Sequence, residues 1–215
     1  MSSVTAVIDY GMGNLHSVQS ALVKAGASDV IVTSDLSLIE AADRVVFPGV
    51  GAIKDCLSEF RGLGCEPVLK KVISRSTPVL AICVGMQSLM THSEENGGVD
   101  ALDVFGGSVR LFDKSSKTEN GEALKVPHMG WNTVSQLTAH PLWDGIPDQS
   151  YFYFVHSYFV PRSECSDALA TVNYGVEAAA VIGRGNVFAT QFHPEKSHDH
   201  GLQLLNNFLT WDGTC

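Results

Sequence analysis

The chain has 215 residues, of which 45% are hydrophobic and 17% charged, and its net charge at pH 7 is −9. This apolar content excludes a largely disordered chain, and no apolar run approaches the length of a membrane-spanning helix. The acidic balance argues against a nucleic-acid partner, and the length favours one domain over residues 1–215.

In the first half of the chain, short apolar strands alternate with amphipathic helices. The predicted strands are Val4–Asp9, Val30–Val32, Val45–Phe47 and Val79–Ile82, and the predicted helices are Leu15–Ala25, Leu36–Ala42, Ile53–Phe60, Pro67–Ser74 and Gly85–Met90. Asn14 is the expected N-cap of the first helix, and Gly26 is its expected stop. This alternation predicts an α/β fold with an open, mostly parallel sheet and helices on both faces.

From about Val99 onwards the pattern changes, and strands dominate. The predicted elements are strands at Ser108–Phe112, Thr133–Ser135, Tyr151–Val160 and Ala168–Val172, a hairpin of Ala178–Ile182 and Val187–Phe192 around Gly183–Asn186, and a final helix at Gly201–Trp211. The polar stretch Asp113–Glu122 is an expected loop. The C-terminal half therefore adds antiparallel strands to the parallel sheet.

Two features indicate a cytoplasmic protein. The segment Met1–Val4 lacks the basic and apolar regions of a secretion signal. The five cysteines are odd in number, irregularly spaced and without a C-x-x-C pair, which is typical of reduced thiols. We therefore expect no disulfide framework, no structural zinc site and no membrane association.

The segment Val79–Gln87 carries the clearest chemical signal, because an apolar strand meets Cys83 and then Gly85. This order is the cysteine counterpart of a nucleophile elbow, in which a tight turn lifts the nucleophile above the carboxyl ends of the strands. The helix that follows would favour a thiolate. The alternative is a cysteine that is simply buried at the end of a strand.

A second signal is the segment Thr190–Glu195, in which Pro194 biases His193 towards an extended backbone. In an extended segment His193 and Glu195 point to the same side, and a carboxylate beside an imidazole can orient a catalytic base. The spacing is common and on its own carries no function.

A third signal is the glycine-rich turn Phe47–Ala52, which can bring backbone N–H groups close to an anion. Together with the N–H of Val84 it could form an oxyanion hole. The alternatives are a phosphate loop or a plain turn, although the Gly-Lys-Ser/Thr of a Walker loop is absent.

Six motifs, in order and over nearly the whole chain, resemble the class I (triad) glutamine amidotransferases, whose fold is flavodoxin-like. They are Ile8–Leu15, Pro48–Ala52, Ile82–Gln87, Pro127–Asn132, Phe154–Tyr158 and Gln191–Ser197. The first and fourth motifs resemble the amidotransferase subunits of imidazole glycerol phosphate synthases in histidine biosynthesis. Ala81 departs from the glycine that the class often has there, but alanine is still small.

The resemblance implies a glutaminase that needs no cofactor, with Cys83 as nucleophile, His193 as acid and base, and Glu195 as the residue that orients His193. It also implies two further sets of residues that act on glutamine. The oxyanion hole would use Val84, Val50 and Gly51, and the glutamine pocket would use Gly51, Gln87, His156, Ser157 and Tyr158.

The resemblance further implies a heterodimer with a (β/α)₈-barrel cyclase, to which ammonia passes inside the complex. The expected products are imidazole glycerol phosphate and an aminoimidazole carboxamide ribotide. The residues expected to face the partner or its ammonia gate are Met129, Trp131, Asn132 and Lys196. Because the chain is acidic, we expect the partner to bind the phosphorylated ligand, and this chain to bind only glutamine.

Glycines flank Val50 on both sides, so the peptides of this loop can rotate at little steric cost. We therefore expect the oxyanion hole to be complete only when partner and ligand are bound.

Three alternatives stay open. The chain could be a Cys-His-Glu hydrolase that acts alone, such as a γ-glutamyl hydrolase, or a catalytically idle subunit that only activates a partner. A metal site could form from His193, His198, Asp199 and His200. The last three also suit the start of the final helix, where Asp199 complements the helix dipole, and no metal is expected.

Overall fold

The computed structural model of the chain describes residues 3–113, 115 and 123–214. Its helices, in chain order, are α1 (Leu15–Lys24), α2 (Leu36–Ala41), α3 (Ile53–Gly62), α4 (Cys65–Ser74), α5 (Val84–Ser88) and α6 (His198–Thr210). Its strands are β1 (Val4–Ile8), β2 (Asp29–Thr33), β3 (Arg44–Gly49), β4 (Val79–Cys83), β5 (His92–Ser93), β6 (Val99–Asp100), β7 (Ser108–Leu111), β8 (His128–Gln136), β9 (Ser150–His156), β10 (Tyr158–Phe159), β11 (Ala168–Asn173), β12 (Glu177–Arg184) and β13 (Val187–Thr190).

Within the described residues, one large sheet runs in the order β2-β1-β3-β4-β13-β12-β11-β8-β9. The pairs from β2 to β13 are parallel, and the pairs from β13 to β9 are antiparallel. The predicted α/β fold, with a mostly parallel sheet extended by antiparallel strands, is therefore confirmed. Because β13 pairs with β4, the two halves of the chain share one sheet; the single domain over residues 1–215 stays a prediction.

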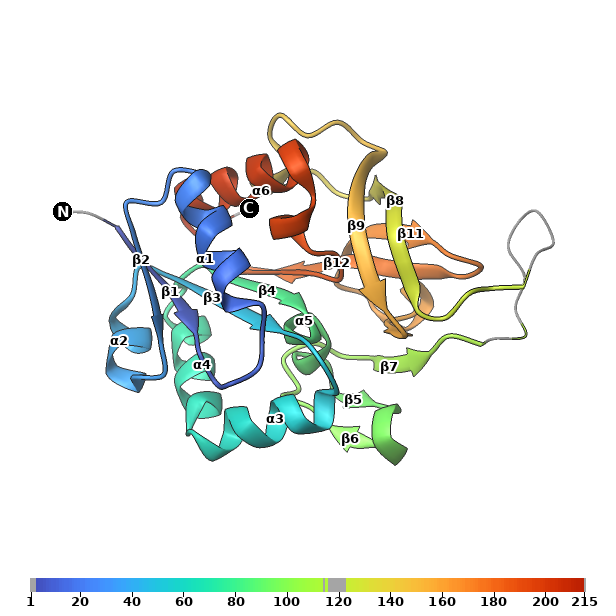
Figure 1. The fold of residues 1–215 in the computed structure, drawn as a ribbon, viewed down its shortest axis with the longest axis horizontal. Helices are drawn as coiled ribbons and strands as arrows, with labels where there is room; N and C mark the ends of the chain where they lie inside the picture. The colour runs from blue at the N-terminus through green and yellow to red at the C-terminus, as the bar shows by residue number, and fades with distance from the viewer. Residues whose placement is uncertain (1–2, 114, 116–122, 215) are drawn as a thin grey trace.

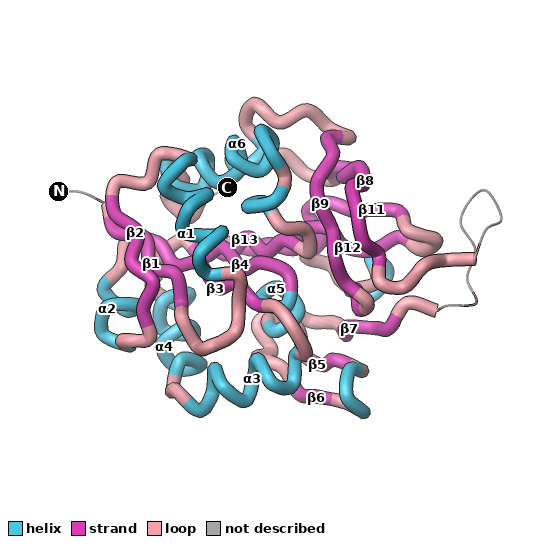
Figure 2. The backbone as a smooth tube through the Cα atoms, in the orientation of Figure 1, coloured by secondary structure: helices cyan, strands magenta, loops and turns pink. Residues whose placement is uncertain are grey.

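The helices cover the parallel part of the sheet on both faces, with α1 and α6 above it and α2, α3 and α4 below it in Figure 1. Strand β4 is buried along its whole length, as expected for a parallel strand between two helical layers. Figure 2 shows β8 and β9 running steeply beside β11, at the end of the large sheet far from β2. A second, smaller sheet runs in the order β10-β7-β5-β6.

The predicted strand Tyr151–Val160 is wrong as a single element. It is divided at Ser157 into β9, which pairs with β8, and β10, which pairs with β7 of the small sheet. At this corner between the two sheets, His156 Nδ1 lies 2.8 Å from the Tyr158 carbonyl oxygen and forms a hydrogen bond with it. Apolar residues occur on both sides of Ser157 because each strand has a buried face. Hydrophobicity alone therefore does not show where β9 ends and β10 begins.

Other boundaries shift by a few residues. Asn14 is at the N-cap position of α1 but makes no side-chain capping hydrogen bond. The predicted hairpin forms, although β12 continues to Arg184 and β13 ends at Thr190. The expected loop Asp113–Glu122 lies largely outside the described residues.

Candidate active site

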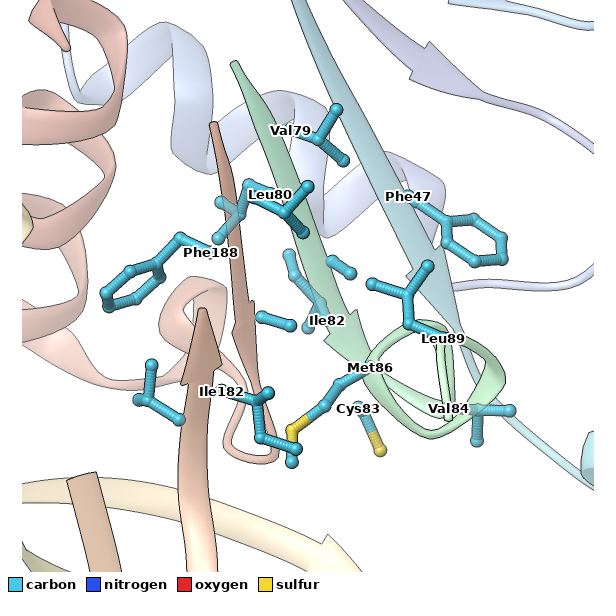
Figure 3. Close-up of a cluster of buried hydrophobic side chains, with 14 of the residues drawn as sticks. Phe47, Val79, Leu80, Ile82, Cys83, Val84, Met86, Leu89, Ile182 and Phe188 are labelled. Atoms are coloured by element: carbon cyan, nitrogen blue, oxygen red, sulfur yellow. The ribbon is translucent and has the colours of Figure 1, made fainter. Parts of the chain in front are cut away.

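Cys83 lies at the strand-to-helix turn between β4 and α5, with φ +56° and ψ −110°. This backbone conformation is sparsely populated for a residue with a side chain, and such strain is typical of a nucleophile elbow. Figure 3 shows Cys83 at the tip of β4, below the apolar side chains of Leu80 and Ile82 that anchor the strand. The predicted elbow is therefore present, and Cys83 is only 4% exposed.

The glycine-rich turn after β3 approaches the elbow so closely that side chains are excluded. A Cβ on Gly85 would lie 2.1 Å from the Phe47 carbonyl oxygen, and one on Gly49 would lie 2.7 Å from the Gly85 nitrogen. Gly51 has φ +91°, a conformation that L side chains rarely adopt. These positions are therefore glycine for reasons of space and backbone angle.

Two side-chain hydrogen bonds, one buried and one partly buried, hold the carbonyl groups of this turn. The Tyr10 hydroxyl donates to the Pro48 carbonyl at 2.7 Å, and the Cys56 thiol donates to the Val50 carbonyl at 3.2 Å. Burial raises the pKa of the Cys56 thiol to about 11, so this group stays a protonated donor at neutral pH. The peptide after Val50 is thus held in one orientation, although its glycine neighbours would permit others.

His193 and Glu195 meet through a tight turn rather than along a strand. His193 itself has the extended backbone that Pro194 favours, but the segment does not stay extended, because Pro194–Lys196 forms a 3₁₀ turn with His193 at its N-cap. The turn brings His193 Nδ1 to 2.7 Å from Glu195 Oε1. A carboxylate only accepts, so Nδ1 carries a proton.

The turn is itself attached to β9. The His193 N–H donates to the Tyr153 carbonyl at 2.9 Å, and the Ser197 hydroxyl donates to the His193 carbonyl at 2.6 Å. The other ring nitrogen of His193, Nε2, is buried and has no hydrogen-bond partner among the described residues. The imidazole is therefore fixed in place while one of its nitrogens stays free for chemistry.

The environment of His193 favours its charged form. Burial by itself lowers the pKa of this imidazole, but its interactions with Cys83 and with the Glu195 carboxylate outweigh burial and raise the pKa to about 10. The side chains of His193 and Glu195 are 2% and 0% exposed, so their charges interact with little screening. Together with Cys83 they can form a thiolate–imidazolium pair backed by a carboxylate.

A cavity of about 620 Å³ lies next to Cys83 and His193, and most of the predicted site residues line it. Its lining contains Val50, Gly51, Cys83, Val84, Gln87, His156, Ser157, Tyr158, His193 and Lys196. Glu195 lies behind His193 and does not line the cavity, and Met129, Trp131 and Asn132 lie outside it. The size suits a small polar ligand.

Two residues that sequence reasoning missed belong to the site. Glu95 lines the cavity, and its carboxylate accepts the Ile53 N–H at the start of α3 at 2.9 Å. Gln191, which is fully buried, donates from Nε2 to Cys83 Sγ at 3.8 Å. Glu95 stands in a polar stretch with no pattern. Gln191, by contrast, lies in the segment Thr190–Glu195 that the sequence analysis singled out for His193 and Glu195, but no role was assigned to it.

The outer surface of β8 and β9 carries large exposed apolar side chains. Met129, Trp131 and Tyr151 are 62%, 43% and 58% exposed. Trp131 stacks on His198 with ring centroids 4.9 Å apart, and Lys196 Nζ lies 6.0 Å from the centre of the Tyr153 ring. Such clustering on one face is typical of an interaction surface.

Asn132 differs from the other predicted partner residues because its side chain turns inward. Its Nδ2 donates to the Asn173 carbonyl at 2.9 Å and lies 3.4 Å from His128 Nε2. Alternation along β8 explains this, since Asn132 shares a face with His128 and not with Trp131.

The alternative of a metal site finds no support in the geometry. Among the residues that the structure describes, no three His, Cys, Asp or Glu side chains converge as metal ligands would. His193 is bonded to Glu195, His198 stacks on Trp131, and His200 packs near Phe152. Four cysteines within the described ranges are free and buried.

Comparison with known proteins places this geometry in context. The model of the family "Glutamine amidotransferase class-I" matches residues 6–211 of the chain. The imidazole glycerol phosphate synthase subunit HisH of Pseudomonas putida is 59% identical to the chain, and the match covers 97% of each protein. The subunit HisH 1 of Pseudomonas aeruginosa is 57% identical, with 99% of each protein covered.

Solved structures agree on the fold. The PurLQS structure from Thermotoga maritima has a TM-score of 0.72 at 16% identity, and the match covers 98% of this chain and 99% of the other. At this identity the likeness concerns the fold alone. No helix in the described ranges is long and apolar enough to cross a membrane.

Proposed function

The chain belongs to the class I glutamine amidotransferase family, and from that premise we propose that it is the glutaminase subunit of an imidazole glycerol phosphate synthase. It hydrolyses glutamine to glutamate and ammonia, and the ammonia serves the cyclase reaction of histidine biosynthesis. The observation that carries this proposal is the strained elbow of Cys83 beside the buried His193–Glu195 pair, at the wall of one cavity.

The first chemical step is the attack of the Cys83 thiolate on the side-chain carbonyl carbon of glutamine. The carbon–sulfur bond forms as the carbonyl electrons move onto oxygen, and the oxyanion lies next to the backbone of Val84 and of the Val50–Gly51 turn. Collapse of this intermediate breaks the carbon–nitrogen bond and leaves a γ-glutamyl thioester on Cys83.

His193 moves the protons of both half-reactions. Its raised pKa keeps it an imidazolium beside the thiolate, so it can protonate the departing nitrogen and release ammonia. The neutral imidazole then takes a proton from water, whose oxygen attacks the thioester carbon. The carbon–sulfur bond breaks, which releases glutamate and restores the Cys83 thiolate. Glu195 holds Nδ1 throughout, which directs Nε2 towards the reacting atoms.

The polar lining suits the zwitterionic head of glutamine. Both Nε2 protons of Gln87 are used within the protein, towards the Tyr158 carbonyl and Gln191 Oε1, so only its carbonyl oxygen can serve a ligand. That oxygen and the Glu95 carboxylate are acceptors for the α-ammonium group of the substrate. Ser157 and Tyr158 line the same cavity.

The partner that we propose is a (β/α)₈-barrel cyclase in a one-to-one complex. The exposed side chains of Met129 and Trp131, together with Tyr151, form the apolar surface that it would cover. Lys196 lines the cavity and also lies over the Tyr153 ring on this side of the molecule, which makes it the link between surface and cavity. Ammonia passing this way avoids protonation in bulk water. We propose the cytoplasm as the location.

The test is the release of glutamate from glutamine, measured with and without the candidate cyclase and its ribonucleotide ligand. We expect a weak rate for the isolated chain and a large increase in the complex. Cys83→Ala should reduce the glutamine-dependent rate by about 10⁴-fold or more, and leave ammonia-dependent synthesis in the complex unchanged. Glutamine use by this variant would contradict the assignment of the nucleophile.

The same measurements separate the two remaining alternatives. A hydrolase that acts alone would show equal rates with and without the cyclase and would not copurify with it. An idle binding subunit would activate its partner but would not be trapped at Cys83 by a glutamine-like electrophile. The buried Cys83, His193 and Glu195 cluster favours the active glutaminase over both.

A further inference from the structure

Two buried amide side chains, one in the cavity lining and one behind it, connect the Tyr158 carbonyl to the sulfur of Cys83. Gln87 on α5 is 3% exposed, and Gln191, which directly follows β13, is 0% exposed. Gln87 Nε2 lies 3.0 Å from Gln191 Oε1, and Gln191 Nε2 lies 3.8 Å from Cys83 Sγ. The mechanism above uses the first amide for substrate and leaves the second without a role.

The orientation of both amides follows from what their neighbours can accept. Gln87 Nε2 is 2.9 Å from the Tyr158 carbonyl, which can only accept, so this end of Gln87 must be the NH₂ group. Its second proton then faces Gln191, which must present its oxygen to it. Gln191 therefore has its own NH₂ group turned towards Cys83, and the reverse orientation would place two donors together.

A chain of ring nitrogens fixes the Tyr158 carbonyl from the other side. His156 Nδ1 lies 2.8 Å from that carbonyl and must donate to it, which makes its Nε2 an acceptor for His128 Nδ1 at 3.1 Å. His128 Nε2 then accepts from Asn132 Nδ2 at 3.4 Å. Burial lowers the pKa of both histidines, to about 4 for His128 and about 3 for His156, so both are neutral, as these donor and acceptor roles require.

The thiolate of Cys83 needs more than one donor. A buried anion is costly unless it is paired and hydrogen-bonded, and Cys83 is 4% exposed. His193 supplies a positive charge, but it gives up its proton when ammonia leaves and so does not stay a constant partner. An amide N–H does not titrate, and it is present at every stage of the reaction.

We propose that Gln191 is a further catalytic residue, whose Nε2–H hydrogen-bonds Cys83 Sγ and stabilises the thiolate before attack and again when the thioester is hydrolysed. Gln87, through its second proton, and the His156–His128–Asn132 chain, through the Tyr158 carbonyl, hold Gln191 in the donating orientation; they are positioning residues. The inference rests on the proposed function, because it takes Cys83 as the nucleophile.

The experiment measures the rate at which iodoacetamide alkylates Cys83 as a function of pH, read by mass spectrometry of the Cys83 peptide. Three variants of the full chain are compared with the wild type. Gln191→Met keeps the length of the side chain and removes the donor, and Gln191→Glu replaces the donor with an oxygen. Thr190→Val is the matched control, because Thr190, the neighbouring residue at the end of β13, is equally buried but its hydroxyl donates only to the Phe192 carbonyl.

We expect Gln191→Met to alkylate Cys83 about tenfold more slowly than the wild type at pH values below the midpoint, with the midpoint about one pH unit higher. Gln191→Glu should move the midpoint further in the same direction, and Thr190→Val should leave it in place. A Gln191→Met profile that coincides with that of the wild type overturns the proposal, even if Gln191→Glu is slow, since charge repulsion would then explain the latter.

The same data separate this inference from the proposed function. Cys56 is equally buried and is an internal reference, because its thiol is protonated at neutral pH. If Cys83 of the wild type reacts no faster than Cys56, the assignment of the nucleophile fails, and the role of Gln191 fails with it. If Cys83 reacts faster but all profiles coincide, only the role of Gln191 fails.

Discussion

Around Cys83, the groups that face the cavity are placed by close packing of the backbone, whereas His193 is placed by hydrogen bonds to its side chain and to its turn. The elbow of Cys83 and the turn around Gly49 are held by an approach too close for any Cβ. His193, by contrast, depends on Glu195 and on the attachment of its turn to β9.

This difference indicates which parts of the site tolerate substitution and which parts respond to protonation. Backbone placement does not depend on protonation, but it fails when a single methyl group is added. Placement by hydrogen bonds tolerates small changes in side-chain size. It depends, however, on which nitrogens carry protons and on what covers β8 and β9. The nucleophile is therefore held rigidly, and the groups that act on it are the adjustable part.

The largest effect is expected for Gly85→Ala, which tests whether close backbone packing holds the elbow. The new methyl group would overlap the Phe47 carbonyl, so we expect a loss of roughly 3 kcal/mol or more in the free energy of unfolding, measured with urea. Gly62→Ala is the control, because the end of α3 has open space there; it should raise stability by about 0.5 kcal/mol. Equal stabilities of the two variants would show that the elbow is not held by close packing.

A second test uses the pH dependence of the C-terminal region. The pKa of His128 is lowered to about 4 because its ring is buried, stacked between Phe154 and Tyr174, while an imidazole of the unfolded chain titrates near 6.5. As the pH falls below 6.5 the unfolded chain binds the proton first. The stability associated with a neutral His128 is therefore intact above pH 6.5 and is lost as the pH falls towards 4.

We expect the free energy of unfolding of His128→Asn to fall less steeply than that of the wild type between pH 6.5 and 4, by about 2 kcal/mol over this range. Asparagine is chosen because its amide can still donate to His156. The control is His16→Asn, an exposed position on α1, which should keep the wild-type slope. A His128→Asn curve parallel to the wild type would mean that the buried ring is not held neutral by the fold.

The smallest effect concerns the outer surface of β8 and β9. Trp131→Ala should weaken binding of the cyclase roughly tenfold, or about 1.4 kcal/mol, without lowering the stability of the isolated chain by a similar amount. Val23→Ala, an exposed apolar position on α1, is the control and should bind as the wild type does. Titration calorimetry would reveal equal affinities if this surface were not the interface.

Several features of the site were predictable because they are local. The apolar run before Cys83 and the glycine after it define the elbow, and the spacing of His193 and Glu195 allows them to meet. The backbone between His193 and Glu195 nevertheless differs from the extended segment considered from the sequence, since it forms a 3₁₀ turn. Pro194 fits either geometry, so the motif predicts the contact but not the backbone that makes it.

Other features arise from contacts between distant segments. Glu95 enters the cavity because the short elements after α5 fold back against the start of α3, where its carboxylate accepts an N–H. Asn132 was expected to face the partner, yet the register of β8 against β9 places His128 opposite His156 and turns Asn132 inward. No spacing within one segment reports such pairings.

By itself, the sequence determined the order of strands and helices, the elbow at Cys83 and the chemistry of the triad, because these depend on residue type and on neighbours a few positions away. Only the tertiary structure decided that β13 inserts beside β4, which brings Gln191 and His193 to the sulfur. The tertiary structure also decided the orientation of the buried amides and the tautomers of the buried imidazoles, because these depend on which donors and acceptors lie next to them.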